Sequence, residues 1–504
     1  MTPERPPDLV VEAPGVSEES SVPWPLLLGQ KVTNKAEDKG WYPWVVLATT
    51  LFGLLTITFT ITILAVSIPG IAEDLDTSEA TLTWVITGPL LAFAVVGPAV
   101  GKLGDRNGHR RIYLIGMAGG ALFAALSALA WSAPALIVFR VLGASIGAAT
   151  GPASMALINT TFPRERRAQA MGYWTLVMAG GPVLGVVIGG PVVEHFSWRL
   201  IFVAQVPIAL FGLFVAFILL PDTEREEPAP FDLKGTLLLA SAVGGALFGL
   251  NRGPEMGWTN PLVIAGFVLA PVLLWVFVKV ERSAIDPLLP LRYLQKRNVR
   301  LPLVVEFTNN FAYMGGFILT PLLLEQVLGY GETKAGLLSI ARPLCFSIAG
   351  PLAGYLTVRT GERKAATFGT LAIASSMIGM SLVTLDTSDV LIVIALGLSG
   401  VGAGATLPAM ASSIANAVDD RDLGVIGAAQ QMVSQLGAVA GIQILQTVQT
   451  SRESSVGEVD AFSSAFLTAA GVALVGTMCA LAVKSTPRVG SHREPTHDVD
   501  PAVT

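Results

Sequence analysis

Three charged residues lie inside long apolar segments of this sequence. They are Arg140, Glu306 and Arg342, and a carboxylate, Asp105, directly follows another apolar segment. A charge at the centre of a hydrocarbon layer costs at least about 2.5 kcal/mol, so these side chains should face a wet cavity or a partner. A buried carboxylate can exchange protons near neutral pH. For Arg140, the alternative is a side chain that reaches the outer membrane surface.

Glu306 belongs to a polar stripe. Asn309, Asn310 and Tyr313 follow it at spacings of three, four and seven residues, which places all four on one face of a helix. Such a face predicts a cavity lining. The alternative is that Glu306, about five residues or roughly 8 Å inside its segment, reaches water at the membrane surface.

Arg342 and two glutamines are further candidates for a cavity. Arg342 stands beside Pro343, and either an anionic group of a bound molecule or a carboxylate partner would explain it. We place it nearer the outer face than Glu306 and do not pair the two. Gln431 and Gln435 either line a cavity or join helix to helix, and helix packing is the favoured interpretation.

The composition indicates a chain whose solvent is lipid. Of 504 residues, 52% are hydrophobic and 14% charged, and the mean hydropathy is +0.62. The four histidines show no zinc spacing and no nucleophile stands with a base, so we expect no enzyme, no metal and no cofactor. There is no basic arm for nucleic acid and no ion-channel filter. The polar N-terminus is not a signal peptide.

Apolar runs long enough to cross a bilayer predict an all-α polytopic membrane protein with about fourteen spans. Their expected ranges are 42–68, 81–102, 112–131, 135–159, 168–192, 200–220, 235–250, 261–280, 302–325, 335–357, 366–385, 389–414, 424–448 and 462–483. About nineteen basic residues fall in the connections on one side and about four on the other, which predicts that both termini are cytoplasmic.

The sequence contains an internal repeat. Residues 97–111 recur as 350–364, with glycines, a proline, a leucine and two arginines coinciding, and each copy ends a span on the same side. Further on, 136–139 is echoed by 391–394. The repeat predicts two pseudo-symmetric six-helix bundles with two inserted helices between them.

The loop of the first copy carries a family resemblance. It resembles the signature of the major facilitator superfamily, specifically its fourteen-span drug:proton antiporter branch. The resemblance implies a major facilitator fold and a cytoplasmic charge cluster that opens and closes with the transport cycle. Its residues would be Gly101, Asp105, Arg106, Gly108, Arg110 and Arg111.

Two further motifs resemble that family. Arg140, in the fourth span, matches an embedded arginine that assists proton coupling. Gly181, Pro182 and Gly185, in the fifth, resemble the motif that distinguishes exporters from importers. Val177 and Val186 stand where that motif usually has glycine. The stretches 197–202 and 231–235 also favour the fourteen-span branch.

One position departs from the branch. Its members usually carry an acidic residue in the first span, and Thr60, which occupies the matching position here, is a cavity candidate. A proton-exchanging carboxylate must then come from elsewhere, with Glu306 the best substitute, or the protein is not a simple proton antiporter.

These features predict a secondary transporter in the cell membrane of a bacterium that exports small amphipathic molecules by proton antiport, as a monomer. We expect a tail at 1–40, a six-helix bundle at 41–220, an inserted helix pair at 221–300, a second bundle at 301–484 and a tail at 485–504. The alternatives are a dedicated exporter or facilitator of one lipid-like or other metabolite, coupled differently, and a scaffold that does not transport. Scarce cavity acids favour anionic, neutral or lipid-like cargo.

Overall fold

A computed structural model describes residues 40–485 except 78, 83, 196, 224–231, 285, 286, 288 and 290. Every regular element in these ranges is helical, which confirms the predicted all-α fold. A helix satisfies its own backbone hydrogen bonds, as a segment in lipid must. The predicted tails at 1–40 and 485–504 lie almost wholly outside the described residues.

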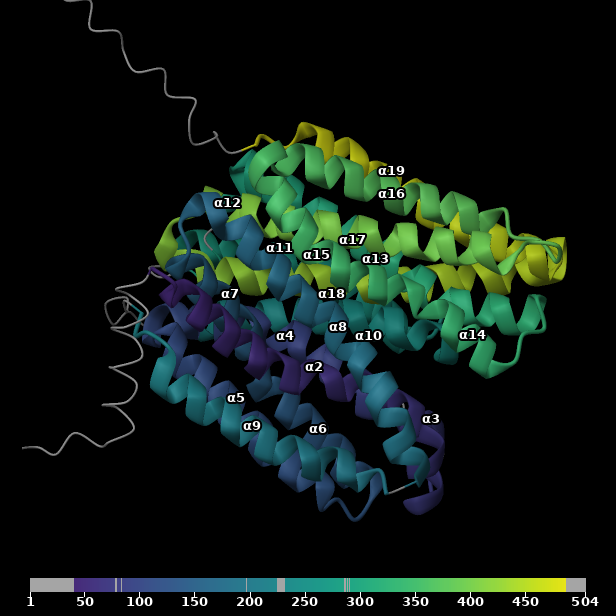
Figure 1. Ribbon diagram of the computed structural model, residues 1–504, viewed down its shortest axis with the longest axis horizontal. Helices are drawn as coiled ribbons and strands as arrows, with labels where there is room; N and C mark the ends of the chain where they lie inside the picture. Colours follow the sequence, from purple (N-terminus) through teal and green to yellow (C-terminus); the bar gives the residue numbers. More distant parts are fainter. Residues whose placement is uncertain are drawn as a thin grey trace, which may run out of the picture.

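The first group of helices occupies the lower part of Figure 1. Contacts between α2 and α8, α5 and α9, and α4 and α6 hold it together. Its elements are α2 (Tyr42–Asp74), α3 (Glu79–Leu82), α4 (Trp84–Asn107), α5 (His109–Ala128), α6 (Ala133–Gly147), α7 (Thr150–Thr161), η1 (Arg164–Arg166), α8 (Arg167–His195) and α9 (Arg199–Leu219). We call this group the first bundle.

The second group of helices, green to yellow, occupies the upper part of Figure 1. It packs α15 against α17, α16 against α17 and α19, and α13 against α18. Its elements are α13 (Arg297–Leu322), the π-helical turn η2 (Leu323–Val327), α14 (Glu332–Ser339), α15 (Ala341–Thr360), α16 (Glu362–Ser381), α17 (Asp389–Ala417), η3 (Asp420–Asp422), α18 (Leu423–Val456) and α19 (Glu458–Ala482). We call it the second bundle.

Two long helices and one short helix connect the bundles. α10 (Leu233–Met256) and α11 (Pro261–Ser283) pack against each other, and α10 also contacts α4 and α18. The short α12 (Arg292–Gln295) leads into the second bundle. The inserted pair is therefore anchored on both bundles through α10.

Each predicted span coincides with a helix or with two consecutive helices. The predicted spans 81–102, 135–159 and 335–357 are each divided, into α3 and α4, α6 and α7, and α14 and α15. By length and apolar composition alone, eight helices among the described residues could cross a membrane, or nine if the bent α4 counts as one span. The total of fourteen stays a prediction.

The two bundles meet where small residues let backbones approach. α8 crosses α15, and α4 crosses α18. A Cβ on Gly172 would lie 2.6 Å from the carbonyl oxygen of Gly350, and one on Gly101 would lie 2.6 Å from that of Gly424. Glycine fits these crossings because any Cβ would clash with the facing carbonyl oxygen. Such close packing matters in lipid, which supplies no hydrophobic drive for helix association.

Both crossings lie near one end of the molecule, where the described chain also begins and ends (Figure 1). We call it the closed end.

Candidate functional site

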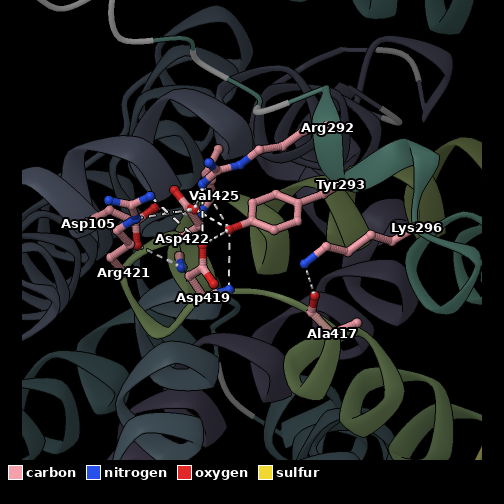
Figure 2. A network of polar contacts seen from close by, with 10 residues as sticks. Asp105, Arg292, Tyr293, Lys296, Ala417, Asp419, Arg421, Asp422 and Val425 are labelled. Carbon is pink, nitrogen blue, oxygen red and sulfur yellow. Dashed lines mark hydrogen bonds and ion pairs between the residues drawn. The ribbon is translucent and has the colours of Figure 1, made fainter.

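Asp105 joins the two bundles at the closed end. It lies near the end of α4 and is only 3% exposed. Its Oδ1 accepts a hydrogen bond of 2.8 Å from the backbone N–H of Gly424, and its Oδ2 accepts one of 2.8 Å from that of Val425. These N–H groups begin α18, where the helix leaves amides unpaired and its dipole attracts negative charge. A carboxylate of the first bundle thus caps a helix of the second (Figure 2).

The glycines around Asp105 have separate structural roles. Gly101 permits the crossing with α18, where a Cβ would also meet Ala428. Gly104 leaves room for the His109 ring, which lies 3.3 Å from Asp105 Oδ1. Gly108 has a φ of +92°, which favours glycine, and turns the chain into α5. The spacing of the predicted motif thus has a physical explanation at each glycine.

The three predicted arginines of this loop differ in their contacts. Arg110 Nη1 pairs with Asp222 at 2.9 Å, within the first bundle. Arg111 is exposed and lies in a shallow groove between α5 and α9. Arg106 is partly buried. Arg110 therefore holds the loop to its own bundle, whereas Asp105 makes the inter-bundle contact.

A second set of polar contacts holds the start of α18 from the α12 side (Figure 2). The buried Tyr293 hydroxyl contacts Oδ2 of both Asp419, at 2.7 Å, and Asp422, at 2.5 Å. Arg292 Nη2 donates to Asp422 Oδ2 at 3.0 Å, and Lys296 Nζ donates to the carbonyl oxygen of Ala417 at 2.8 Å. Together with Asp105 and the first turn of α18, these residues form what we call the inter-bundle polar cluster.

The cluster is electrostatically consistent. The hydrogen bond from Tyr293, followed by the nearby charges of Arg292, Lys296 and Arg421, holds the pKa of Asp419 below its ordinary value. Burial, and then hydrogen bonding to the two carboxylates, raises the pKa of the Tyr293 hydroxyl. Asp419 is therefore an ionised acceptor and Tyr293 a protonated donor at neutral pH.

Sequence reasoning missed Tyr293, Asp419 and Asp422. We counted the basic residues of 281–300 only as a signal of orientation. A tyrosine among arginines and lysines, opposite two aspartates that precede a span, was the available signal.

The second copy of the repeat lies at the other crossing. Gly350 and Gly354 of α15 contact α8, where a Cβ on Gly354 would lie 2.6 Å from the carbonyl oxygen of Ala168. Val358 stands where the first copy has Asp105, so this copy brings no carboxylate to α8. The polar contact here is a 3.0 Å hydrogen bond between the Tyr173 and Tyr355 hydroxyls.

A cavity of about 130 Å³ lies inside the molecule, between helices of the first bundle and α18. Its described lining comes from first-bundle helices and from α18. Most of it is apolar, with Phe93, Phe123 and Phe139 among its walls, and the polar side chains include Arg140, Gln205, Gln431 and Gln435. A mostly apolar pocket with a few convergent polar groups is typical of a small-molecule site.

Arg140 is the only charged side chain in that described lining. Its guanidinium carbon lies 5.7 Å from the ring centroid of Phe202. Its buried Nε has no hydrogen-bond partner. The structure thus places the predicted embedded arginine at a cavity, on the α6 segment that the sequence identified.

Glu306 is fully buried between α13 and α18. Its Oε1 accepts a 2.8 Å hydrogen bond from Gln430 Nε2, and Oε2 has no partner in the structure. In this conformation the carboxylate does not reach the surface. It is absent from the described lining of the cavity, but Gln431, next to its partner, belongs to that lining.

The other members of the polar stripe, on α13, and Arg342, on α15, lie inside the second bundle and away from the described cavity lining. Arg342 is 1% exposed, and its Nη atoms donate to the carbonyl oxygen of Tyr313 and to Thr320 Oγ1, both at 3.3 Å. Asn309 is buried, and the Asn310 amide donates to the carbonyl oxygen of Glu306. Asn309, Asn310, Tyr313 and Arg342 are all absent from the described lining. Their role at a substrate site stays a prediction.

Parts of two predicted sites fall outside the described side chains. Thr60 lies on α2, and Pro182 and Gly185 lie on α8, but their side-chain environments are not among the described ones. Gly181 is buried on α8.

Comparison with known proteins agrees with this architecture. The sequence pattern of the Major Facilitator Superfamily matches residues 50–442 and, in a second match, 307–502. The chain is 32% identical over 424 residues to the tetracenomycin C resistance and export protein of Streptomyces glaucescens, covering 83% of this chain and 77% of that protein. It is 29% identical over 406 residues to the multidrug resistance protein Stp of Mycobacterium tuberculosis, covering 80% and 75%.

A solved structure shows the same fold. The human organic anion transporter MFSD10 superposes with a TM-score of 0.66 at 18% identity, covering 87% of this chain and 99% of that one. The family's sequence pattern covers most of this chain. The two relatives are a resistance and export protein and a multidrug resistance protein, and the helices of this chain build the same fold as the solved structure. The protein is therefore a membrane transporter that belongs to the major facilitator superfamily.

Proposed function

We propose that this protein is a fourteen-span secondary exporter of small amphipathic molecules that works by alternating access. The observation that carries the proposal is a cavity lined by helices of both bundles, together with a closed end held by a few reversible polar pairs. Asp105 accepts from the α18 amides, and Arg167 of α8 donates to the carbonyl oxygen of Ala415 and to Asp420. Its similarity to a tetracenomycin C resistance and export protein and to a multidrug resistance protein supports export as the direction. The buried glycine Gly181 belongs to the motif that favours export in the sequence.

The closed end is the cytoplasmic end in this proposal. It carries Arg110, Arg111, Arg292 and Lys296, and basic residues concentrate on the cytoplasmic side of membrane proteins. With both ends of the described chain there, the number of crossings is even. The conformation described here would then be closed towards the cytoplasm.

Transport in this account requires the inter-bundle polar cluster to open. Asp105 loses its two amide hydrogen bonds when α4 leaves α18, and water replaces them. Because a hydrogen bond to a charged group contributes about 1.5–3 kcal/mol net, the closed state is stabilised by an amount that substrate binding can offset. Such a contact can open and close within a transport cycle.

Glu306 is our candidate for proton coupling. Its uncharged neighbour Gln430 provides one donor and no counter-ion, and Oε2 has no partner, so the structure pairs no cation with this carboxyl. Opening the contact between α4 and α18 moves α18, and with it Gln430, which alters the environment of Glu306. Proton release would thus follow the conformational change.

Liposomes with an enclosed pH-sensitive dye test this role. We expect amphipathic substrates to drive proton movement with wild type, and Glu306→Gln to abolish that movement while it leaves gradient-independent flux of the same substrate measurable. Glu325→Gln, on the exposed turn after α13, is the matched control and should behave as wild type.

The opposite result would favour the facilitator alternative. If Glu306→Gln moves protons as wild type does, coupling does not pass through this residue. If wild type itself moves substrate without protons, the protein is a facilitator, as the lack of an acid at position 60 would allow.

A further inference from the structure

We propose that the cavity binds amphipathic organic monoanions, with the acidic group of the ligand paired to Arg140. This rests on the proposed function and names the class of substrate. The inference begins from the charges around the cavity. Among its described lining residues, Arg140 alone is charged, and its buried Nε is without a hydrogen-bond partner.

The helices that line the cavity offer this arginine no carboxylate along their apolar length, and Glu306 of α13, which packs against α18, is outside the described lining. The cavity is lined by α2, α4, α5, α6, α7, α8, α9 and α18. The acids of these helices stand only near the helix ends, at Glu73, Asp74, Asp105, Glu194 and Glu453. Asp105 is engaged by the α18 amides, and Asp74 pairs with Arg199. The distribution of acids follows from the sequence, so it holds along the full length of each helix.

A guanidinium without a counter-ion in an apolar site is costly, and an anionic ligand that pairs with it recovers that cost. A carboxylate or sulfonate would accept from the Nε–H and from an Nη–H, since arginine presents its donors in a fork that matches two oxygens of one acidic group, and a phenolate oxygen would accept from the Nε–H. A neutral ligand leaves the charge without a counter-ion. A cationic ligand adds a second like charge to a site without an acid.

The rest of the lining selects the body of the ligand. Phe93, Phe123 and Phe139 provide apolar and aromatic walls, and Gln205 Oε1 is buried without a partner, so it can accept from a ligand hydroxyl or amide. A second negative charge would have no cation in the described lining. The lining therefore selects one acidic group on an aromatic or aliphatic body, and the cavity, about 130 Å³ in this conformation, must widen to admit it.

Three fluorescent probes that share one fluorophore test this inference. They are dansylglycine, dansylamide and dansylcadaverine, which are anionic, neutral and cationic at neutral pH. We expect purified wild-type protein to bind dansylglycine at least about tenfold more tightly than dansylcadaverine, because like charges are penalised where no acid is present. This comparison uses wild type alone and does not depend on the folding of a variant.

Substitutions then locate the effect. Arg140→Gln should weaken dansylglycine binding by about tenfold or more and dansylamide binding by less than about twofold, as expected when a charge-assisted pair is lost. Arg140→Lys should retain part of the preference. Arg282→Gln, an exposed arginine at the end of α11, is the control and should match wild type. Equal weakening of all three probes by Arg140→Gln, or tighter binding of the cation to wild type, overturns the inference.

Efflux of the same probes from proteoliposomes separates this inference from the proposed function. Export of the cation as efficiently as the anion would overturn the anion preference and leave the exporter intact. Binding of the anion through Arg140 without any export would do the reverse.

Discussion

At the scale of the residue, one carboxylate distinguishes the two copies of the internal repeat. Asp105 caps α18 across the bundle interface, whereas Val358 at the equivalent position caps nothing on α8. The two crossings therefore differ in kind. The contact between α4 and α18 contains a carboxylate that water can solvate when the helices part. Among the described residues, α8 meets α15 through packing and the Tyr173–Tyr355 hydroxyl pair, and the charge that α8 brings to the second bundle, Arg167, pairs with Asp420 instead.

Asp105→Asn should destabilise the closed end. The amide keeps one acceptor, loses the second and removes the interaction between charge and helix dipole, at a cost of about 1–2 kcal/mol. A cysteine at the fully buried Ala428, in a background in which Cys345 and Cys479 are alanine, reports the opening. Its alkylation should accelerate by roughly 5–30-fold.

Asp222→Asn is the matched control for that measurement. It removes an exposed ion pair with Arg110 inside the first bundle, so the alkylation rate should not change. An Asp105→Asn rate equal to that of the parent would mean that the carboxylate does not hold the bundles together.

At the scale of the element, glycine positions decide which helices cross. Gly101 of α4 and Gly354 of α15 stand at equivalent places in the two copies, and each faces a backbone carbonyl of the other bundle. The repeated glycines were visible in the sequence as a pattern, but their partners on α18 and α8 were not. A partner across a bundle interface depends on how the bundles dock, which no local pattern encodes.

Gly354→Ala should destabilise the protein at its second crossing. The added methyl group would lie 2.6 Å from the carbonyl oxygen of Ala168, which is backbone and cannot rotate away. Overpacking of this kind costs about 1–3 kcal/mol, so the thermal unfolding temperature in detergent should fall by several degrees. Gly471→Ala, on the open face of α19 where a Cβ meets nothing within 4 Å, is the control and should not lower it. An equal fall in the unfolding temperature of the two variants would mean that the close packing of Gly354 on α8 does not stabilise the protein.

At the scale of the whole molecule, the sequence predicted the fold class and the family well. Apolar runs are long, and each predicted span falls on helix, because lipid leaves the backbone no other regular choice. Boundaries within spans were harder. The division of 135–159 into α6 and α7 leaves no mark in the hydropathy, by which Ala133–Thr161 is a single candidate span.

The site was predicted unevenly. Asp105 lies at a bundle contact and Arg140 at a cavity. The family resemblance singled out both residues, and their roles in transport stay predictions. The stripe from Glu306 to Tyr313 shares one face as predicted, yet that face packs inside the second bundle. Helical spacing fixes which side chains share a face, but it does not determine what the face meets.

The measurement that tests alternating access most directly is a distance across the closed end. Spin labels on cysteines at Glu165, before α8, and Lys364, on α16, flank the crossing of α8 and α15, and both positions are exposed. Pulsed electron resonance on the protein in liposomes, with the native cysteines replaced by alanine, should give a short distance at rest. Adding a transported compound should produce a second, longer population. One unchanged distance while the same preparation transports that compound would contradict the account.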